Sequence, residues 1–161
     1  MNIPSDIVQW DKADIVSYYL DTLRWNLIPL RPRSKEPVYK DVTSSALDPA
    51  ELRKELSNGA NIGVYPGDTH VIIDLDSKAD QGESVMRFLN GAGPRLQTIP
   101  RERTRGGVHL HLRVKDLPIF PEANKLVCPK ITPKVIGEMF LRSRGYVVTS
   151  PSVHESGHQY A

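Results

Sequence analysis

Two carboxylates in an apolar run are the first residues of this chain that could do chemistry. Residues 71–76 read VIIDLD, which predicts a buried strand whose period of two places Asp74 and Asp76 on one face. Two like charges at this spacing repel each other unless a cation neutralises them, and hard carboxylate oxygens suit Mg²⁺ or Mn²⁺. The other interpretation is a solvated strand end where both acids cap the next turn, and the pair alone leaves both open.

The segment 104–114, TRGGVHLHLRV, could bind phosphate. Its alternation places four aliphatic side chains on one face of a predicted strand and His109, His111 and Arg113 on the other. The glycine pair at 106–107 permits a close backbone approach, so that exposed N–H groups could meet a phosphate. A glycine pair also commonly makes only a turn, and the segment alone does not decide between the two.

A third candidate is Glu138, which lies between Ile136 and Phe140 on one face of a predicted strand. An acid with apolar neighbours is either a surface residue on a half-exposed edge or a buried group held by a metal or a base. The segment 144–154 ends a further strand in Ser, Pro and His, which is also what an ordinary loop contains.

Three helices are expected to support these groups. Residues 13–25 place apolar side chains at helical spacing. Residues 48–57 form a second helix, with Asp48 as its N-cap and Pro49 at its first position. Residues 81–90 predict the third.

The strands complete a predicted α+β fold with a mixed or antiparallel sheet. The Pro-Gly linker at 66–69 predicts a β-hairpin between the two runs that flank it. The run 31–37, rich in proline and positive charge, is expected to be an exposed loop. The expected strands are 26–30, 61–65, 70–76, 108–114, 135–141 and 145–149.

Composition bounds the class of protein. A chain of 161 residues fits a single domain over 1–161, and its short apolar runs exclude a membrane span, which needs about 20 residues. The single Cys128 cannot form an internal disulfide, so a reducing, cytoplasmic setting is expected. Residues 101–146 carry ten Lys and Arg against four Asp and Glu, whereas residues 1–100 carry 11 against 14. This division is typical of a protein that handles phosphates through metal ions, although an ordinary solvated surface also shows it.

Together these motifs resemble the prim-pol family of bifunctional DNA primase/polymerases, within the archaeo-eukaryotic primase superfamily. Each motif is weak alone, and the ordered set is fairly specific. The resemblance implies a catalytic core around a sheet like that of an RNA-recognition motif, with flanking helices and the acids on its open face. The matching residues are 26–30 and 35–37 (NLIPL, KEP), 61–64 (NIGV), 74–76 (DLD), 104–109 (TRGGVH) and 145–152 (GYVVTSPS), through to Gly157 and Tyr160.

The resemblance also implies which residues are catalytic. Asp74 and Asp76 match the metal-binding acids of the family, and His109 matches the histidine that contacts the phosphates of the incoming nucleotide. The third metal-binding acid is assigned to Glu138, because no other carboxylate lies between residues 122 and 155. The family usually has Asp, a hydrophobic residue and Arg at this point, so the chain departs from the pattern here.

Further residues are candidates for contacts with the nucleotide or the template. His111 is among them, although the family usually has Tyr at that position. The candidates are Lys35, Thr104, Arg105, Gly106, Gly107, His109, His111, Arg113, Ser152 and His154.

The expected activity is template-directed nucleotidyl transfer, as a DNA primase, a DNA polymerase or both. Two Mg²⁺ or Mn²⁺ ions held by the acids would activate a primer 3′-hydroxyl and neutralise the triphosphate during in-line displacement. The expected partners are a DNA template and primer, nucleoside triphosphates, and a helicase domain or subunit, which relatives often carry; no membrane is expected. The resemblance implies a single prim-pol catalytic domain, which in such proteins can be the N-terminal part of a longer chain, and a cytoplasmic setting where a nucleoid, plasmid or virus replicates is expected.

Two other functions stay open. The pair His109 and His111, separated by one leucine, is similar to the metal-binding pair of rolling-circle replication initiators, which cut DNA with a tyrosine. Those enzymes place the tyrosine on a later helix with a lysine four residues on, whereas Tyr146 here lies in a β-like run and Tyr160 lies near the C-terminus. A non-catalytic nucleic-acid-binding module is the second, with basic residues on backbone phosphates and structural acids.

Overall fold

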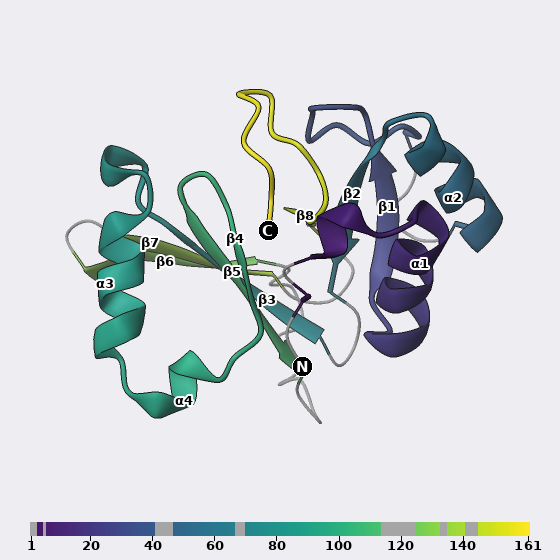
Figure 1. The fold of residues 1–161 in the computed structure, drawn as a ribbon. Coiled ribbons are helices and arrows are strands. Elements are labelled where there is room, and N and C mark those ends of the chain that lie inside the picture. The colour runs from purple at the N-terminus through teal and green to yellow at the C-terminus, as the bar shows by residue number, and fades with distance from the viewer. Residues whose placement is uncertain are drawn as a thin grey trace.

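The computed structural model of the chain describes residues 3–4, 6–40, 47–66, 70–113, 125–132, 135–140 and 145–161. It contains two antiparallel sheets with helices packed against them (Figure 1). This confirms the predicted α+β class. The closer likeness to an RNA-recognition motif stays a prediction.

The two sheets differ in size and in the order of their strands. The smaller has the order β1 (Asn26–Leu30), β2 (Asn61–Tyr65), β8 (Val147–Thr149). The larger has the order β4 (Arg101–Arg103), β5 (Gly107–Arg113), β3 (His70–Asp76), β7 (Val135–Phe140), β6 (Lys125–Thr132). The helical elements are η1 (Ile7–Gln9), α1 (Lys12–Ser17), η2 (Tyr18–Thr22), α2 (Pro49–Ser57), η3 (Lys78–Asp80), α3 (Glu83–Gly91) and α4 (Pro94–Gln97).

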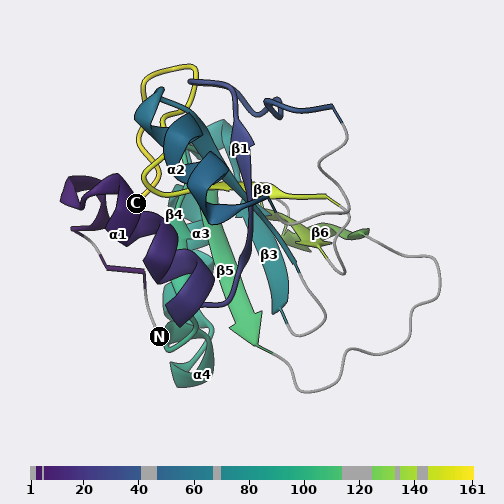
Figure 2. The ribbon, with the colours of Figure 1, turned by 90° about the vertical axis from the view of Figure 1, so that its right-hand side faces the viewer.

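Helices α1 and α2 lie side by side against the three-stranded sheet (Figures 1 and 2). The predicted helix over 13–25 consists of two parts: the α-helix α1 is followed directly by the π-helical turn η2, which ends before β1 begins. Helix α2 begins as predicted: Asp48 accepts a hydrogen bond from the N–H of Ala50 at 2.9 Å, and Pro49 is the first helical residue. Apolar side chains of both helices join Ile62 of β2 in one core.

The five-stranded sheet has one apolar face and one face that carries the candidate chemistry. Val85 and Leu89 of α3 pack against Leu75 and Leu110 on the apolar face. On the opposite face, Ile72 of β3 is fully buried in the core that α1 and α2 form on the smaller sheet. The predicted alternation along β3 is therefore confirmed, and its acids lie on the side where the two sheets meet.

The predicted hairpin between residues 61–65 and 70–76 is wrong. Strand β2 pairs with β1 and β8, whereas β3 pairs with β5 and β7 in the other sheet. A Pro-Gly linker marks a change of direction but does not determine which strand supplies the backbone partners. Every residue of β2 is buried, so this strand takes the centre of its own sheet.

Two strands and a short helix were not predicted. Strand β4 has only three residues, two of them arginines, and gives no apolar alternation. Strand β6 contains Pro129, and its pairing with β7 shifts register between Cys128 and Thr132, which breaks the period of two. Helix α4 has only four residues and begins at Pro94, shortly after the predicted helix over 81–90.

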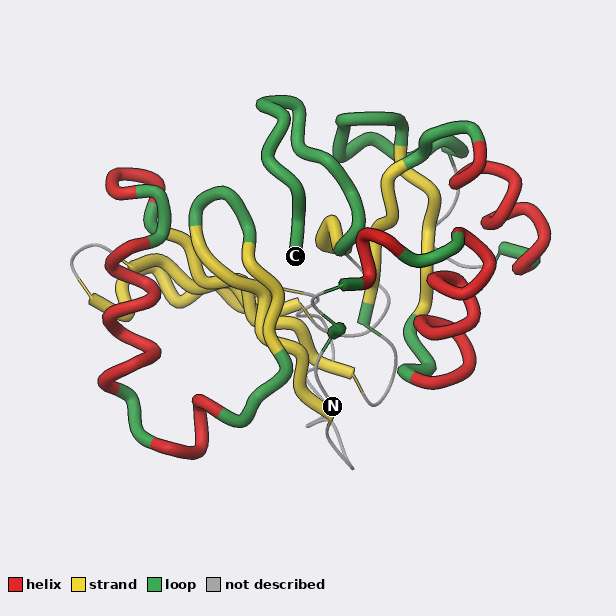
Figure 3. The backbone as a smooth tube through the Cα atoms, in the orientation of Figure 1, coloured by secondary structure: helices red, strands yellow, loops and turns green. Residues whose placement is uncertain are grey.

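The segment 150–161 returns from the smaller sheet to the larger one. It is loop after β8, and its end lies between the two sheets (Figures 1 and 3). Ala161 exchanges two backbone hydrogen bonds with Arg103 of β4, at 2.5 and 3.3 Å. Among the described helices, none has the length and apolar character to cross a membrane.

Candidate active site

Asp74 is the centre of the candidate site. The register of the larger sheet places it directly opposite His109 of β5 on one side and Glu138 of β7 on the other. Side chains of directly opposed residues lie on the same face and within reach of each other. The Nε2 atom of His109 lies 3.7 Å from Oδ1 of Asp74. Three residues from distant parts of the chain therefore converge on one face.

Asp76 joins this group two residues along β3. Its position in the ladder is opposite Gly107, and its carboxylate lies against Gly106. A Cβ atom on Gly106 would collide with Oδ1 of Asp76, and one on Gly107 would collide with the backbone carbonyl of Leu75. The glycine pair is thus required for packing against β3, a reason that the sequence alone did not give.

The electrostatics of Asp74 indicate an excess of negative charge. Burial raises the pKa of Asp74 above its ordinary value, and the charges of Asp76 and Glu138 raise this pKa further. His109 and Lys35 act in the opposite direction. The donor set fits a divalent cation, because carboxylate oxygens are the ligands that Mg²⁺ and Mn²⁺ prefer and a cation would relieve this repulsion.

A cleft lined by basic and aromatic residues lies close to these acids. It has a volume of about 270 Å³, and its lining includes Arg33, Lys35, His154 and Tyr160. The ring of Tyr160 lies nearly parallel to that of His109, with centroids 6.2 Å apart, which connects the cleft to the acids. Burial, with smaller contributions from nearby carboxylates, raises the pKa of Tyr160 to about 12, so its phenol stays neutral.

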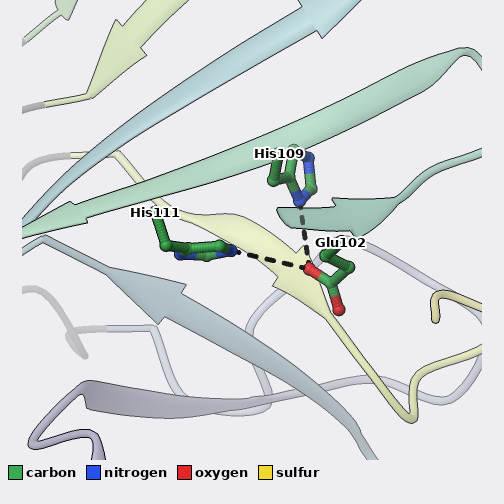
Figure 4. Close-up of side chains that lie close together, drawn as sticks. All are labelled: Glu102, His109 and His111. Carbon is green, nitrogen blue, oxygen red and sulfur yellow. Dashed lines mark hydrogen bonds and ion pairs between the residues drawn. The ribbon is translucent and has the colours of Figure 1, made fainter. Parts of the chain in front are cut away.

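Glu102 is the site residue that sequence reasoning missed. Its side chain is fully buried, opposite His109 in the pairing of β4 with β5. Oε2 lies 3.3 Å from Nδ1 of His109 and 3.9 Å from Nε2 of His111 (Figure 4). Oε1 accepts hydrogen bonds from the hydroxyl of Thr149, at 3.0 Å, and from the N–H of Ser150.

The charge of Glu102 is compensated by these partners. Burial alone would raise its pKa, but the hydrogen bond from His109 and the proximity of His111 bring the pKa of Glu102 below its ordinary value. The donor atoms of the three side chains lie within 4.8 Å of one another, so the group could also hold a metal ion. The local sequence does not indicate that Glu102 is buried, since a glutamate between two arginines is typical of a surface strand.

Several predicted contact residues are engaged within the fold. His111 is buried, with Nδ1 3.1 Å from Nε2 of His70 and its ring stacked on Trp25 at a centroid distance of 4.2 Å. The hydroxyl of Ser152 accepts a hydrogen bond from the N–H of Ile62 at 2.7 Å. His111 thus packs the larger sheet against Trp25, Ser152 joins the segment after β8 to β2, and neither lines the cleft.

The remaining predicted residues are divided between two places. Thr104 and Arg105 form the turn between β4 and β5. Burial lowers the pKa of His154 in the cleft, and the charge of Arg105 lowers it further. Arg113 is exposed at the other end of β5, where it lines a separate cavity of about 430 Å³ together with Arg24 and other residues.

Comparison with known proteins points to one family. The family model described as Prim-Pol, "Bifunctional DNA primase/polymerase, N-terminal", matches residues 17–161. The match covers both sheets and every residue of the candidate site. Among curated proteins, none matches the chain.

Proposed function

The chain belongs to the Prim-Pol family, as its motifs predicted, and from this premise we propose that Asp74, Asp76 and Glu138 form the metal centre of a template-directed nucleotidyl transferase. The family supports a primase or polymerase type of nucleotidyl transfer in DNA replication, with DNA and nucleotides as substrates. The observation that carries the proposal is the register of β3 with β7, which sets Asp74 directly opposite Glu138.

The acids fit the family's dependence on divalent metal. Burial raises the pKa of Asp74, the charges of Asp76 and Glu138 raise it further, and a divalent cation would stabilise this arrangement. Two such ions, Mg²⁺ or Mn²⁺, would lower the pKa of the primer 3′-hydroxyl and neutralise charge on the triphosphate. The acids would supply oxygen ligands to these ions from fixed positions on a rigid sheet.

The residues around the acids would orient the nucleotide. His109 presents Nε2 to the side of Asp74, where a phosphate oxygen of the nucleotide would lie. Lys35 and His154 line the adjacent cleft, and their positive or hydrogen-bonding groups suit the remaining phosphates. Phosphoryl transfer depends chiefly on positioning and charge neutralisation, which is what this set of side chains provides.

The geometry gives less support to the tyrosine-dependent nicking mechanism. Tyr146 lies just before β8 and donates its hydroxyl to the carbonyl of Lys35 at 2.6 Å. Tyr160 is buried beside His109 in a loop. In the described part of the chain, neither tyrosine lies on a helix as the initiators require.

Primer extension tests the proposal. The protein with Mn²⁺ or Mg²⁺ should add labelled nucleotides to a primer on a DNA template, and Asp74→Asn should abolish the addition while the fold persists. Asp21→Asn, an exposed aspartate on η2, is the matched control and should extend normally. Full extension by Asp74→Asn would reject the metal centre. A tyrosine-linked DNA adduct would favour the nicking mechanism, and DNA binding without incorporation would favour the binding module.

A further inference from the structure

The two carboxylate oxygens of Glu102 contact different sets of partners. Oε1 receives the N–H of Ser150 and the hydroxyl of Thr149, both on or next to β8. The backbone N–H of Ser150 can only donate, so Oε1 must be an acceptor. Oε2 is left to face Nδ1 of His109 and Nε2 of His111 (Figure 4).

This arrangement determines which nitrogen of His109 carries a proton. An ionised carboxylate can only accept hydrogen bonds, so Nδ1 of His109 must donate to Oε2 across 3.3 Å. Nε2 then faces the opposite side, toward Oδ1 of Asp74. The contact with Glu102 at Nδ1 thus fixes the ring so that Nε2 lies on the side of Asp74, where the nucleotide would bind.

The surroundings hold the His109 ring in place. The ring of Tyr160 lies nearly parallel to it. On the far side of Glu102, His111 directs Nε2 toward the same Oε2 atom, and its Nδ1 lies 3.1 Å from Nε2 of His70. Glu102, His109 and His111 are all buried, so water does not compete for these contacts.

We propose that Glu102 is a positioning residue for nucleotidyl transfer, whose buried carboxylate holds His109 with Nδ1 protonated and Nε2 directed at the phosphates of the incoming nucleotide. The inference rests on the proposed function, because it requires that His109 contact the nucleotide. It assigns to β4, which lies outside the acidic strand, an effect on nucleotide use that is exerted through His109. It also explains why a glutamate is fully buried, although the groups that contact its other oxygen, the hydroxyl of Thr149 and the N–H of Ser150, are uncharged.

A structural metal is the competing explanation for the same three side chains. Such a metal would need Nδ1 of His109 and Nε2 of His111 without their protons. The group offers three donor residues among those described, whereas structural zinc sites have four. The hydrogen-bonded arrangement uses both oxygens of Glu102 without any further ligand.

Glu102→Gln is the sharpest variant. Ser150 N–H keeps the amide oxygen on its side, so the amide NH₂ must point at Nδ1 of His109 and donate to it. The proton of His109 then moves to Nε2, so the tautomer that Glu102 fixes is reversed and the ring loses its contact with a carboxylate. Since charge-assisted hydrogen bonds are about twice as strong as neutral ones, KM for the nucleotide should rise about 10-fold while kcat changes less.

Nitrogen NMR of the histidine rings gives a readout that does not depend on activity. Nδ1 of His109 should be protonated in the wild-type protein and bare in Glu102→Gln. A bare Nδ1 in the wild type overturns the proposal, even if the variant fails to fold. So does a stoichiometric transition metal in the purified wild type that Glu102→Gln releases.

A double-mutant cycle separates positioning from general destabilisation. His109→Phe keeps a ring beside Tyr160, and in this background Glu102→Gln should raise KM no further. An equal rise in both backgrounds would make Glu102 merely structural and would overturn the proposal. Leu89→Ala, in the core on the other face of the sheet, is the destabilised control and should leave KM unchanged. If the wild type incorporates no nucleotide, the proposed function fails, whereas the nitrogen spectrum still decides whether Glu102 holds His109.

Discussion

Asp74 of β3 lies directly opposite Glu138 of β7, in a register that continues from Ile72 to Asp76. This pairing brings a carboxylate from 64 residues further along the chain to the acids of residues 74–76. This pairing places like charges beside Asp74, so the residues that we propose to bind a cation also repel Asp74 in the metal-free protein. Function and stability should therefore respond in opposite directions when Glu138 is neutralised.

Glu138→Gln should lower primer extension by about 10-fold or more, because one oxygen ligand is lost from the metal centre. In a chelator, the same variant should be at least as stable as the wild type, because a repulsion on Asp74 is removed. Extension kinetics and urea unfolding measure the two effects. A variant that loses stability in chelator and keeps full extension would show that Glu138 is a structural residue.

Gly106→Ala and Gly107→Ala should fail in different ways. A methyl group at 106 meets the end of the Asp76 side chain, which can rotate away, so the fold should persist while extension is lost. A methyl group at 107 meets the backbone of Leu75, which cannot move cheaply, so this variant should lose about 3 kcal/mol of stability or more. Chemical denaturation and extension assays on both proteins make the comparison. Normal extension by Gly106→Ala would show that Asp76 need not stay in place.

Lys35→Ala should raise KM for the nucleotide about 10-fold, because a charged hydrogen bond to phosphate is lost from the cleft. The residue is exposed, so the free energy of unfolding should change little. Lys54→Ala, which removes an equally exposed lysine from α2, is the control for the loss of one positive charge. Equal KM values for the two variants would mean that Lys35 does not touch the nucleotide.

Stability should fall as the pH drops below about 6.5. Burial, helped by the charges of His111 and Arg113, lowers the pKa of His70 from 6.5 to about 3. Between these values the unfolded chain binds a proton that the folded protein excludes, so each pH unit costs about 1.4 kcal/mol for this group. His70→Phe keeps a ring against Trp25 and should flatten the slope by one proton between pH 6 and 4. An unchanged slope would show that His70 is not buried in its neutral form.

Alternation along single strands predicted much of the candidate site. The placement of Asp74 and Asp76 on one face, and of His109 on the face of its own strand, required only the period of two. The position of Glu138 beside them required the pairing of β3 with β7, which a single sequence does not state. Glu102 was beyond prediction, because its burial depends on β8 and on the strand it pairs with.

The errors in the fold have the same origin. Residues 67–69 of the predicted hairpin linker lie outside the described residues, and the partners of β2 and β3 come from residues 26–30, 107–113, 135–140 and 147–149. The start of the helix at Asp48 and Pro49 was predicted closely, since capping is a local interaction, and the bounds of β1, β2 and β3 were predicted from their own residues. Local chemistry determines where elements begin, whereas sheet order depends on contacts between distant segments.

Mn²⁺ binding, measured by electron paramagnetic resonance, would show whether Asp74 and its neighbours on the sheet form one metal centre. Wild type should bind Mn²⁺ in the presence of a nucleoside triphosphate. Asp74→Asn and Glu138→Gln should each weaken that binding by about 10-fold or more, whereas the control Asp21→Asn should not. If Asp74→Asn binds as many Mn²⁺ ions as the wild type and with equal affinity, Asp74 is not part of a metal centre.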